Sequence, residues 1–246
     1  MKSGYLSEIF ISFQGEGAHV GRRHLFVRLA GCNMRCRYCD TPDSLERSAG
    51  YTIYGPGERV AYQENPVSAV DLAHVITSTL ESEPAVDAIA LTGGEPLVQS
   101  EFLVALLEAG RFRLPVLLET NGVLPQRLRD VLPFVHIISM DIKLPSNTSE
   151  PAFWEEHAAF LVLARGKDLY VKILVDQSTT DAEVERAACL LAPLRPPVPA
   201  FLQPIVAPDA RPLIAAGRLT DLYVLARQHL DSIRVLPQTH KLLGIR

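Results

Sequence analysis

Residues 31–40 read GCNMRCRYCD, and this segment holds three of the four cysteines in the chain, spaced C-x3-C-x2-C. Thiolates are soft ligands that bind zinc and iron–sulfur clusters, and three of them on one short loop can hold one face of a metal centre. A structural zinc site has four protein ligands, and no fourth cysteine or histidine lies near this segment in the sequence. The spacing therefore favours a 4Fe-4S cluster held by Cys32, Cys36 and Cys39, with one iron left for another ligand.

Zinc and a disulfide are the two other interpretations of these cysteines. The chain opens without the basic and apolar regions of a secretory signal peptide, and no run approaches the roughly 18 apolar residues of a membrane span. We therefore expect a reducing, cytoplasmic setting without membrane attachment, where clustered cysteines more often bind metal or act in catalysis. Cys189 lies apart among alanines and leucines, and is predicted to be a buried free thiol in a helix.

Length and composition suit one globular unit. The chain has 246 residues, 48% of them hydrophobic, which is enough for a sizeable core. A net charge of −4 provides no general attraction to nucleic acid or to an anionic membrane. We expect a single domain over residues 1–246, with a cluster loop at 31–41 and a polar insertion at about 50–64 to which no role is assigned.

Short apolar runs alternate with helical patterns along the chain. The runs are rich in Val, Ile, Leu and Phe and predict buried parallel strands at 24–29, 88–91, 115–119, 136–140, 170–175, 200–205 and 233–236. Helical patterns lie between them at 69–80, 100–109, 126–131, 151–164, 182–191 and 213–229. This order predicts an α/β fold, a single parallel (β/α) barrel, complete or incomplete, with a doubly wound sheet as the alternative.

Polar and glycine-bearing segments follow most of the predicted strands. In parallel α/β folds the carboxyl ends of the strands share one rim, and the chemistry gathers there. We therefore expect one site built from residues 32–39, 92–96, 119–122, 139–143, 203–204 and 237–241.

Two of these segments carry a family resemblance. The cysteine spacing with Tyr38 before the third cysteine, and Thr92-Gly93-Gly94-Glu95-Pro96 downstream, resemble the radical S-adenosylmethionine (SAM) enzymes. The resemblance implies that the free iron binds SAM, whose reductive cleavage yields a 5′-deoxyadenosyl radical that abstracts hydrogen from substrate. Paired glycines permit close backbone approach and a carboxylate can pair with the SAM ammonium. The residues so assigned to SAM are Tyr38, Cys39, Asp40, Gly93, Gly94, Glu95, Ser139, Met140, Asp141, Lys143, Gln203 and Gln238.

Within the SAM set, Ser139, Asp141 and Lys143 alternate along a predicted strand end and so share one face. That face is expected to meet the ribose hydroxyls and the carboxylate of SAM. The alternative is a polar strand terminus with surface ion pairs.

A second set of motifs narrows the resemblance. Phe13-Gln14-Gly15-Glu16-Gly17, Cys39-Asp40-Thr41, Glu119-Thr120-Asn121-Gly122 and Gln238-Thr239-His240-Lys241 are similar to the 7-carboxy-7-deazaguanine synthase family. The resemblance covers residues 7–241 and implies a carbon–nitrogen lyase of queuosine and deazapurine biosynthesis. Such an enzyme converts 6-carboxy-5,6,7,8-tetrahydropterin to 7-carboxy-7-deazaguanine by hydrogen abstraction, ring contraction and loss of ammonia. It also implies Mg²⁺ bound through Thr41, a homodimer, and an electron donor such as flavodoxin or ferredoxin.

The same resemblance assigns substrate contacts. Arg28 would meet the substrate carboxylate in two-point contact, and carboxylates would accept from the donors on the pterin edge. A strand-end salt bridge is the alternative for Arg28, and a turn-organising role is the alternative for Glu119. His240 and Lys241 are expected at the surface. The residues assigned to the substrate are Phe13, Gln14, Gly15, Glu16, Arg28, Thr92, Glu119 and Pro237.

Two rival functions stay open from the sequence. A glycyl-radical-enzyme activase shares the cysteine spacing, the Gly-Gly-Glu-Pro segment and the short chain, but the Phe-Gln-Gly-Glu-Gly block and the Thr-His-Lys tail argue against it. A metal-binding scaffold without catalysis predicts zinc and a colourless protein, whereas the synthase hypothesis predicts a brown one. A scaffold has no need for a Gly-Gly-Glu-Pro loop on the same rim.

Overall fold

The computed structural model describes residues 2–55 and 60–246. A ten-stranded sheet runs through it in the order β12-β11-β10-β9-β8-β7-β3-β2-β4-β5. Seven neighbouring strands of this sheet are parallel, and they confirm the seven strands predicted from sequence. They are β3 (Arg23–Leu29), β7 (Ala88–Gly93), β8 (Val116–Thr120), β9 (Ile137–Ile142), β10 (Asp168–Val175), β11 (Ala200–Pro204) and β12 (Ile233–Val235).

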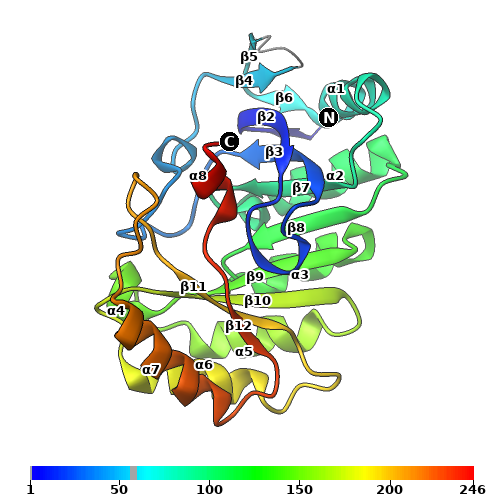
Figure 1. Ribbon diagram of the computed structural model, residues 1–246. Coiled ribbons are helices and arrows are strands. Elements are labelled where there is room, and N and C mark those ends of the chain that lie inside the picture. The colour runs from blue at the N-terminus through cyan, green and yellow to red at the C-terminus, as the bar shows by residue number, and fades with distance from the viewer. Residues whose placement is uncertain (1, 56–59) are drawn as a thin grey trace.

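The helices pack against the outer face of these strands (Figure 1). The six predicted helices are all present, as α1 (Ala69–Ser82), α2 (Ser100–Gly110), α3 (Pro125–Val131), α5 (Trp154–Leu163), α6 (Asp181–Leu191) and α7 (Ala216–Arg227). Thr180 starts α6 in a capping box, in which its hydroxyl accepts from the Glu183 amide and the Glu183 carboxylate accepts from the Thr180 amide. Two short helices, α4 (Pro145–Thr148) and α8 (Thr239–Leu243), were not predicted.

The sheet is an incomplete barrel. Its parallel strands follow one another in chain order from β3 to β12, without the reversal that defines a doubly wound sheet. In the described part of the chain no strand pairing joins β12 to the β3 side of the sheet. The predicted parallel barrel is therefore confirmed in its incomplete form, and the doubly wound alternative is wrong.

Further strands missing from the prediction extend the sheet beyond β3. β2 (Leu6–Phe13) is antiparallel to β3, and β4 (Gly50–Tyr54) and β5 (Val60–Glu64) follow as an antiparallel hairpin at the sheet edge. The hairpin is the predicted polar insertion, whose residues 56–59 lie outside the described residues. A separate pair joins β1 (Ser3–Gly4) to β6 (Val67–Ser68).

The prediction that Cys189 is buried is wrong. Its helix, α6, buries Val184, Ala187, Ala188 and Leu191, which recur at helical spacing along one face. Cys189 falls outside that stripe and is exposed, with its Sγ 3.7 Å from His229 Nδ1.

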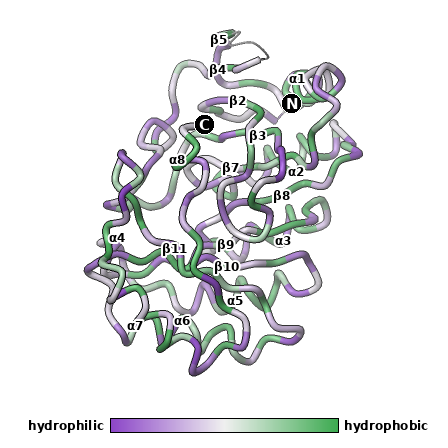
Figure 2. The backbone as a smooth tube through the Cα atoms, in the orientation of Figure 1, coloured by the Kyte–Doolittle hydropathy of each residue, from purple (hydrophilic) through white to green (hydrophobic). Residues whose placement is uncertain are grey.

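Two apolar layers line the two faces of the sheet, as the green strands in Figure 2 indicate. The larger layer lies between strands and helices, and the smaller lines the inner face. Because side chains alternate along a strand, the residue two positions after each inner apolar residue also faces inward. A polar layer thus stands above the apolar one, formed by Arg28, Thr92, Glu119, Ser139, Lys172 and Gln203, and Asp141 follows two residues beyond Ser139.

The C-terminal segment crosses the inner side of the barrel near β2 (Figure 1). The Thr239 amide donates to the Gly15 carbonyl at 2.9 Å, and Arg246 donates to Glu8 at 2.6 Å. The His240 ring packs so closely on Gly15 that a Cβ at position 15 would lie within 3.0 Å of it. Segments from the two ends of the chain therefore meet beside the inner face.

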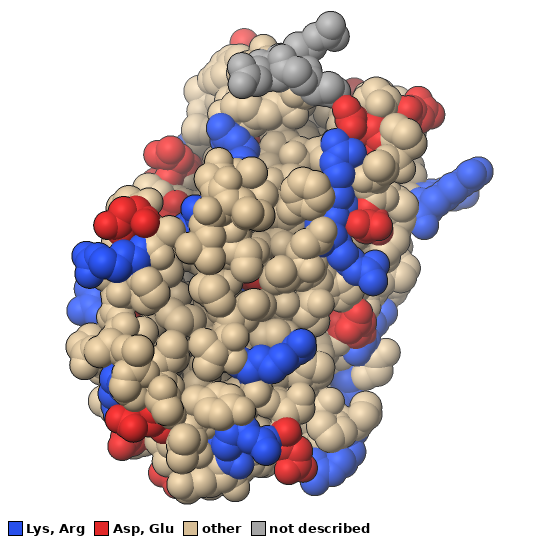
Figure 3. All heavy atoms as spheres, viewed as in Figure 1, with Lys and Arg blue, Asp and Glu red and all other residues tan. Residues whose placement is uncertain are grey.

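The surface carries mixed charge. On the face in Figure 3, acidic and basic side chains are interspersed, in keeping with the small net charge of −4. None of the helices in residues 2–55 and 60–246 combines the length and the apolar character needed to cross a membrane.

Candidate functional site

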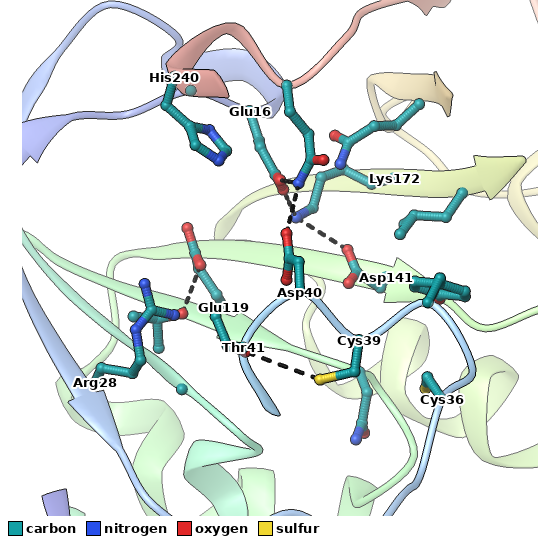
Figure 4. Close-up of a pocket in the computed structure, with 18 of the residues that line it drawn as sticks. Glu16, Arg28, Cys36, Cys39, Asp40, Thr41, Glu119, Asp141, Lys172 and His240 are labelled. Carbon is teal, nitrogen blue, oxygen red and sulfur yellow. Dashed lines mark hydrogen bonds and ion pairs between the residues drawn. The ribbon is translucent and has the colours of Figure 1, made fainter. Parts of the chain in front are cut away.

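The inner face of the barrel opens into a cavity of about 380 Å³ (Figure 4). Its wall is built by the loop after β2, the cluster loop, the carboxyl ends of the parallel strands and the C-terminal segment. The rim expected from the sequence is therefore one site. The predicted residues that line it are Phe13, Gln14, Gly15, Glu16, Arg28, Cys32, Cys36, Tyr38, Cys39, Asp40, Thr41, Thr92, Gly93, Gly94, Glu95, Glu119, Asp141, Lys143, Gln203 and Gln238.

Three predicted residues lie off this wall. Met140 points to the outer face of β9 and is fully buried in the core against the helices, so only its backbone faces the barrel interior. Ser139 faces inward but is covered, with 1% of its surface exposed. Pro237 stands just before Gln238, which is the residue that reaches the cavity.

The three clustered cysteines lie on the loop after β3, on one side of the cavity. The Cys39 amide donates to the Cys36 carbonyl at 3.1 Å, which curls the loop toward the barrel. Burial raises the pKa of Cys32 to about 11 and also raises that of Cys36. No three Cys, His, Asp or Glu side chains of the described residues converge on one metal ion. Three soft thiolates on one side of the cavity are the ligand type of an iron–sulfur cluster.

The Gly-Gly-Glu segment is bonded directly to the backbone of the cluster loop. The Gly94 amide donates to Leu29 at 3.1 Å, and the Glu95 amide donates to Gly31 at 3.0 Å. A Cβ on Gly93 or on Gly94 would lie within 3.0 Å of these backbone atoms, and Gly93 has a φ of 134°. Both positions therefore require glycine, because no side chain fits between the two loops.

Glu95 is a buried carboxylate aimed at this junction, with 1% of its surface exposed. It accepts hydrogen bonds from the Leu97 amide at 3.0 Å, the Thr120 hydroxyl at 2.9 Å and the Asn121 amide at 2.7 Å. Burial raises the pKa of Glu95 to about 7 although these donors favour the ionised form. An ammonium group in the cavity would stabilise the ionised form further, and this is the chemistry expected of a SAM-binding carboxylate.

A second carboxylate, Glu119, lies near the end of β8, directly before Thr120, which donates to Glu95. The two Glu119 oxygens accept from the Thr92 hydroxyl at 2.7 Å and from Gln14 Nε2 at 2.8 Å. Arg28 donates through Nε to Glu8 at 2.8 Å. The strand-end ion pair considered for Arg28 is therefore present, and Arg28 also lines the cavity, while its contact with a substrate carboxylate stays a prediction.

A series of ion pairs between acidic and basic side chains runs along the cavity (Figure 4). Asp141 has a lysine on each oxygen, with Lys143 Nζ at 2.8 Å and Lys172 Nζ at 3.1 Å. Lys172 also pairs with Glu16. Burial opposes ionisation of Asp141 and Glu16, but the neighbouring lysines outweigh it and lower the pKa of both carboxyl groups.

The C-terminal segment continues this chain of charges. Gln238 Nε2 donates to Glu16 at 2.6 Å and to Asp40 at 3.1 Å, and Lys241 Nζ donates to Asp40 at 2.9 Å. Burial opposes ionisation of Asp40, but Lys241 and Gln238 outweigh it and hold the pKa of Asp40 at about 2. The segment is thus attached to the residue that directly follows the third cysteine.

Two outcomes differ from the sequence analysis. His240 and Lys241 were expected at the surface, but both are half-buried and line the cavity. Lys172 was not predicted as a site residue. A signal for Lys172 existed, since it is the only charged residue within the apolar run 170–175 and lies two positions from inward-facing Tyr170.

Comparison with known proteins shows which family this chain resembles. Residues 27–176 match the model of the radical SAM superfamily. A 7-carboxy-7-deazaguanine synthase of Geobacter sulfurreducens is 38% identical, over 97% of this chain and 96% of that protein. A protein of the same name from Methanothermobacter thermautotrophicus is 33% identical, over 97% of this chain and 96% of its own length.

Solved structures share the fold. QueE from Escherichia coli superposes with a TM-score of 0.64 at 22% identity, covering 96% of this chain and 94% of that one. A radical SAM methyltransferase from Sphaerobacter thermophilus gives a TM-score of 0.61 at 14% identity, covering 88% of this chain and 66% of the other.

Proposed function

Because the chain belongs to the radical SAM superfamily and, within it, to the 7-carboxy-7-deazaguanine synthase family, we propose that its cavity converts 6-carboxy-5,6,7,8-tetrahydropterin to 7-carboxy-7-deazaguanine. The observation that carries the proposal is that one cavity contains both the three cysteines and the Gln14–Glu119–Thr92 group. A radical enzyme needs this proximity, since its cofactor and its substrate must meet out of contact with water. Relatives that bear the synthase name over nearly the whole chain leave the activase and scaffold hypotheses without support.

The residues near the three cysteines form the cofactor side of the cavity, and each of them has a distinct role. When bound, a 4Fe-4S cluster and SAM supply a carbon radical that abstracts hydrogen. Cys32, Cys36 and Cys39 hold the cluster, and Glu95 accepts the SAM ammonium beside it. Gln203 supports this assignment, because its Oε1 is buried at the wall and has no hydrogen-bond partner among the described residues. A donor on the cofactor would satisfy that oxygen.

The remaining cofactor contacts come from β9 and from the glycine loop. Asp141 and Lys143 face the ribose hydroxyls and the carboxylate of SAM, and Gly93 and Gly94 let the backbone approach it. The ion pair between Asp141 and Lys143 supports this role, because it holds both side chains in fixed positions on the wall.

The substrate side binds and orients the pterin. Glu119 and Glu16 accept hydrogen bonds from the amino and amide edge of the pterin ring. Arg28 meets the substrate carboxylate, and its bond to Glu8 fixes the guanidinium at the wall. Phe13 covers one ring face, and its 49% exposure in the free protein leaves apolar surface for that contact.

Thr41 would hold Mg²⁺, which would supply a positive charge for the substrate carboxylate. The Thr41 hydroxyl lies 4.0 Å from Cys39 Sγ and lines the cavity, and Asp40 beside it is held by Lys241. A hydroxyl is a suitable oxygen ligand for a hard cation that keeps other oxygens around it.

Family membership also supports a cytoplasmic homodimer that takes electrons from flavodoxin or ferredoxin.

Anaerobic turnover tests the function. Reconstituted protein incubated with 6-carboxy-5,6,7,8-tetrahydropterin, SAM, Mg²⁺ and dithionite should form 7-carboxy-7-deazaguanine and ammonia. Cys36→Ala should abolish the product, whereas Cys189→Ala, which changes the exposed cysteine on α6, should leave it unchanged. A brown, cluster-loaded wild type that releases 5′-deoxyadenosine without any deazaguanine would show that the substrate is another molecule.

A further inference from the structure

Lys172 is a buried cation within the apolar run 170–175 of β10. It lies in the middle of β10, with 4% of its surface exposed, and the inward-facing residues on either side of it are Tyr170 and Leu174. A buried ammonium is costly unless opposite charges and hydrogen bonds compensate for its lost hydration. The contacts of its amine should therefore reveal why the strand carries it.

The amine joins two carboxylates from different parts of the chain. Lys172 and Asp141 are register partners on neighbouring parallel strands, which brings Nζ to 3.1 Å from Asp141 Oδ1. Glu16 arrives from the loop after β2 and pairs with the same Nζ. Figure 4 shows Lys172 between Glu16 and Asp141.

The two carboxylates depend on Lys172 to different degrees. Asp141 keeps a second lysine, Lys143, on its other oxygen at 2.8 Å. Among the described residues, the donor to the other oxygen of Glu16 is the neutral amide of Gln238, at 2.6 Å. Without the Lys172 charge, Glu16 would face Asp141 as a like charge in a buried site, and repulsion would displace or neutralise it.

We propose that Lys172 is a positioning residue that holds Glu16 ionised and in place for the substrate, using Asp141 of the cofactor side as its anchor. This inference rests on the proposed function, because it takes Glu16 as a pterin-binding group. Lys172 itself acts through Glu16. Its loss should therefore weaken substrate binding much more than cofactor binding.

Binding measurements on the reconstituted enzyme test the proposal. The dissociation constants of 6-carboxy-5,6,7,8-tetrahydropterin and of SAM are measured separately by anaerobic equilibrium dialysis, without reductant. Lys172→Met should weaken pterin binding about 10- to 100-fold, as expected for one lost charge-assisted contact. SAM binding should change by less than about threefold, because Lys143 still holds Asp141.

A double-mutant cycle separates positioning from general damage. Glu16→Gln should weaken pterin binding by a similar factor, and Lys172→Met added to Glu16→Gln should weaken it little further. Lys167→Met, in the turn directly before β10, is the matched control and should leave both constants unchanged.

Two results would overturn the proposal. One is an equal loss of pterin and SAM binding in Lys172→Met, which would indicate collapse of the cavity. The other is full additivity with Glu16→Gln. A wild type that does not bind the pterin would instead refute the proposed function, so the two failures are distinguishable.

Discussion

Gly94 and Gly31 touch through their backbones, so that a Cβ at position 94 would lie within 3.0 Å of the Gly31 carbonyl oxygen. This contact joins the Gly-Gly-Glu segment to the loop of the three cysteines, and the hydrogen bond from the Glu95 amide to Gly31 at 3.0 Å lies beside it. The position of Glu95 is therefore set by the same backbone that carries Cys32. Cluster loading and cofactor binding should fail together when this contact is disturbed.

Gly94→Ala should lower cluster loading. The added methyl group has backbone atoms of Gly31 and Ser44 in its way, and such overpacking costs about 1–3 kcal/mol when the backbone must shift. We expect the iron content and the charge-transfer absorbance after anaerobic reconstitution to fall well below wild type. Gly217→Ala in α7 is the control, since a Cβ there meets nothing within 4 Å. Wild-type iron content in Gly94→Ala would contradict the packing argument.

Buried histidines should make stability depend on pH. Burial lowers the pKa of His24 and of His157 to about 4, from the ordinary value of 6.5. The unfolded chain therefore binds more protons between these values, and the free energy of unfolding falls as the pH drops below about 6.5. Each histidine accounts for about 1.4 kcal/mol of loss between pH 7.5 and pH 5.5.

His24→Phe should remove the part of this pH-dependent loss in unfolding free energy that comes from His24. The melting temperature of the reconstituted variant should drop by about 3 °C less than that of wild type between pH 7.5 and pH 5.5. His74→Gln, on the exposed side of α1, should behave as wild type does. An unchanged pH dependence in His24→Phe would show that His24 does not carry the effect.

Lys241→Met should loosen the C-terminal segment over the cavity. The variant leaves Asp40 with Gln238 alone, and the pKa of Asp40 rises from about 2 because its cation is gone. We expect KM for the pterin to rise about 3- to 10-fold, as for a partly exposed ion pair.

The exposed pair of Lys2 and Glu101 provides the matched control for Lys241. Lys2→Met removes a surface lysine from an ion pair far from the cavity, and its KM should equal that of wild type. If Lys241→Met also matched wild type, the segment would not depend on this ion pair.

Glu119→Gln should impair substrate binding while preserving the cofactor. The amide cannot accept from both Thr92 and Gln14 and also present an anionic oxygen to the pterin. We expect KM for the pterin to rise about 10- to 100-fold, with SAM affinity unchanged. Glu185→Gln is the control, because Glu185 is an exposed residue of α6. If Glu119→Gln lost SAM affinity and pterin affinity equally, the assignment of Glu119 to pterin binding would be wrong.

Thr41→Val should remove the dependence on magnesium. Valine matches the shape of threonine but lacks the oxygen that a hard cation requires. Activity of the variant should be low and insensitive to added Mg²⁺, while cluster content stays at the wild-type level. A variant that still responds to Mg²⁺ as wild type does would show that the ion binds elsewhere.

Local pattern predicted the parallel strands and their rim well, because buried strands and their polar carboxyl ends carry strong sequence signals. Thr92, Glu119 and Asp141 fall in segments predicted for this rim, whereas Arg28 was assigned through the family resemblance. Lys172 was missed although its place in an apolar strand signals that it faces inward. The pairing of Lys241 with Asp40 spans 201 residues, and nothing local to either residue indicates it. Cys189 was predicted to be buried because of its apolar neighbours. The buried face of α6 contains neighbours such as Ala188 and Leu191 but does not include position 189.

The contact of the His240 ring with Gly15 has a consequence for evolution. A side chain at position 15 would meet both the ring and the Cβ of His240, so it fits only if residue 240 is smaller and the C-terminal segment shifts, and the two positions are under a shared constraint despite their distance along the chain. Substitutions there should occur as pairs within lineages. A lineage that keeps the bulky residue at 240 should keep glycine at 15, and covariation between the two positions would record the contact without any structure.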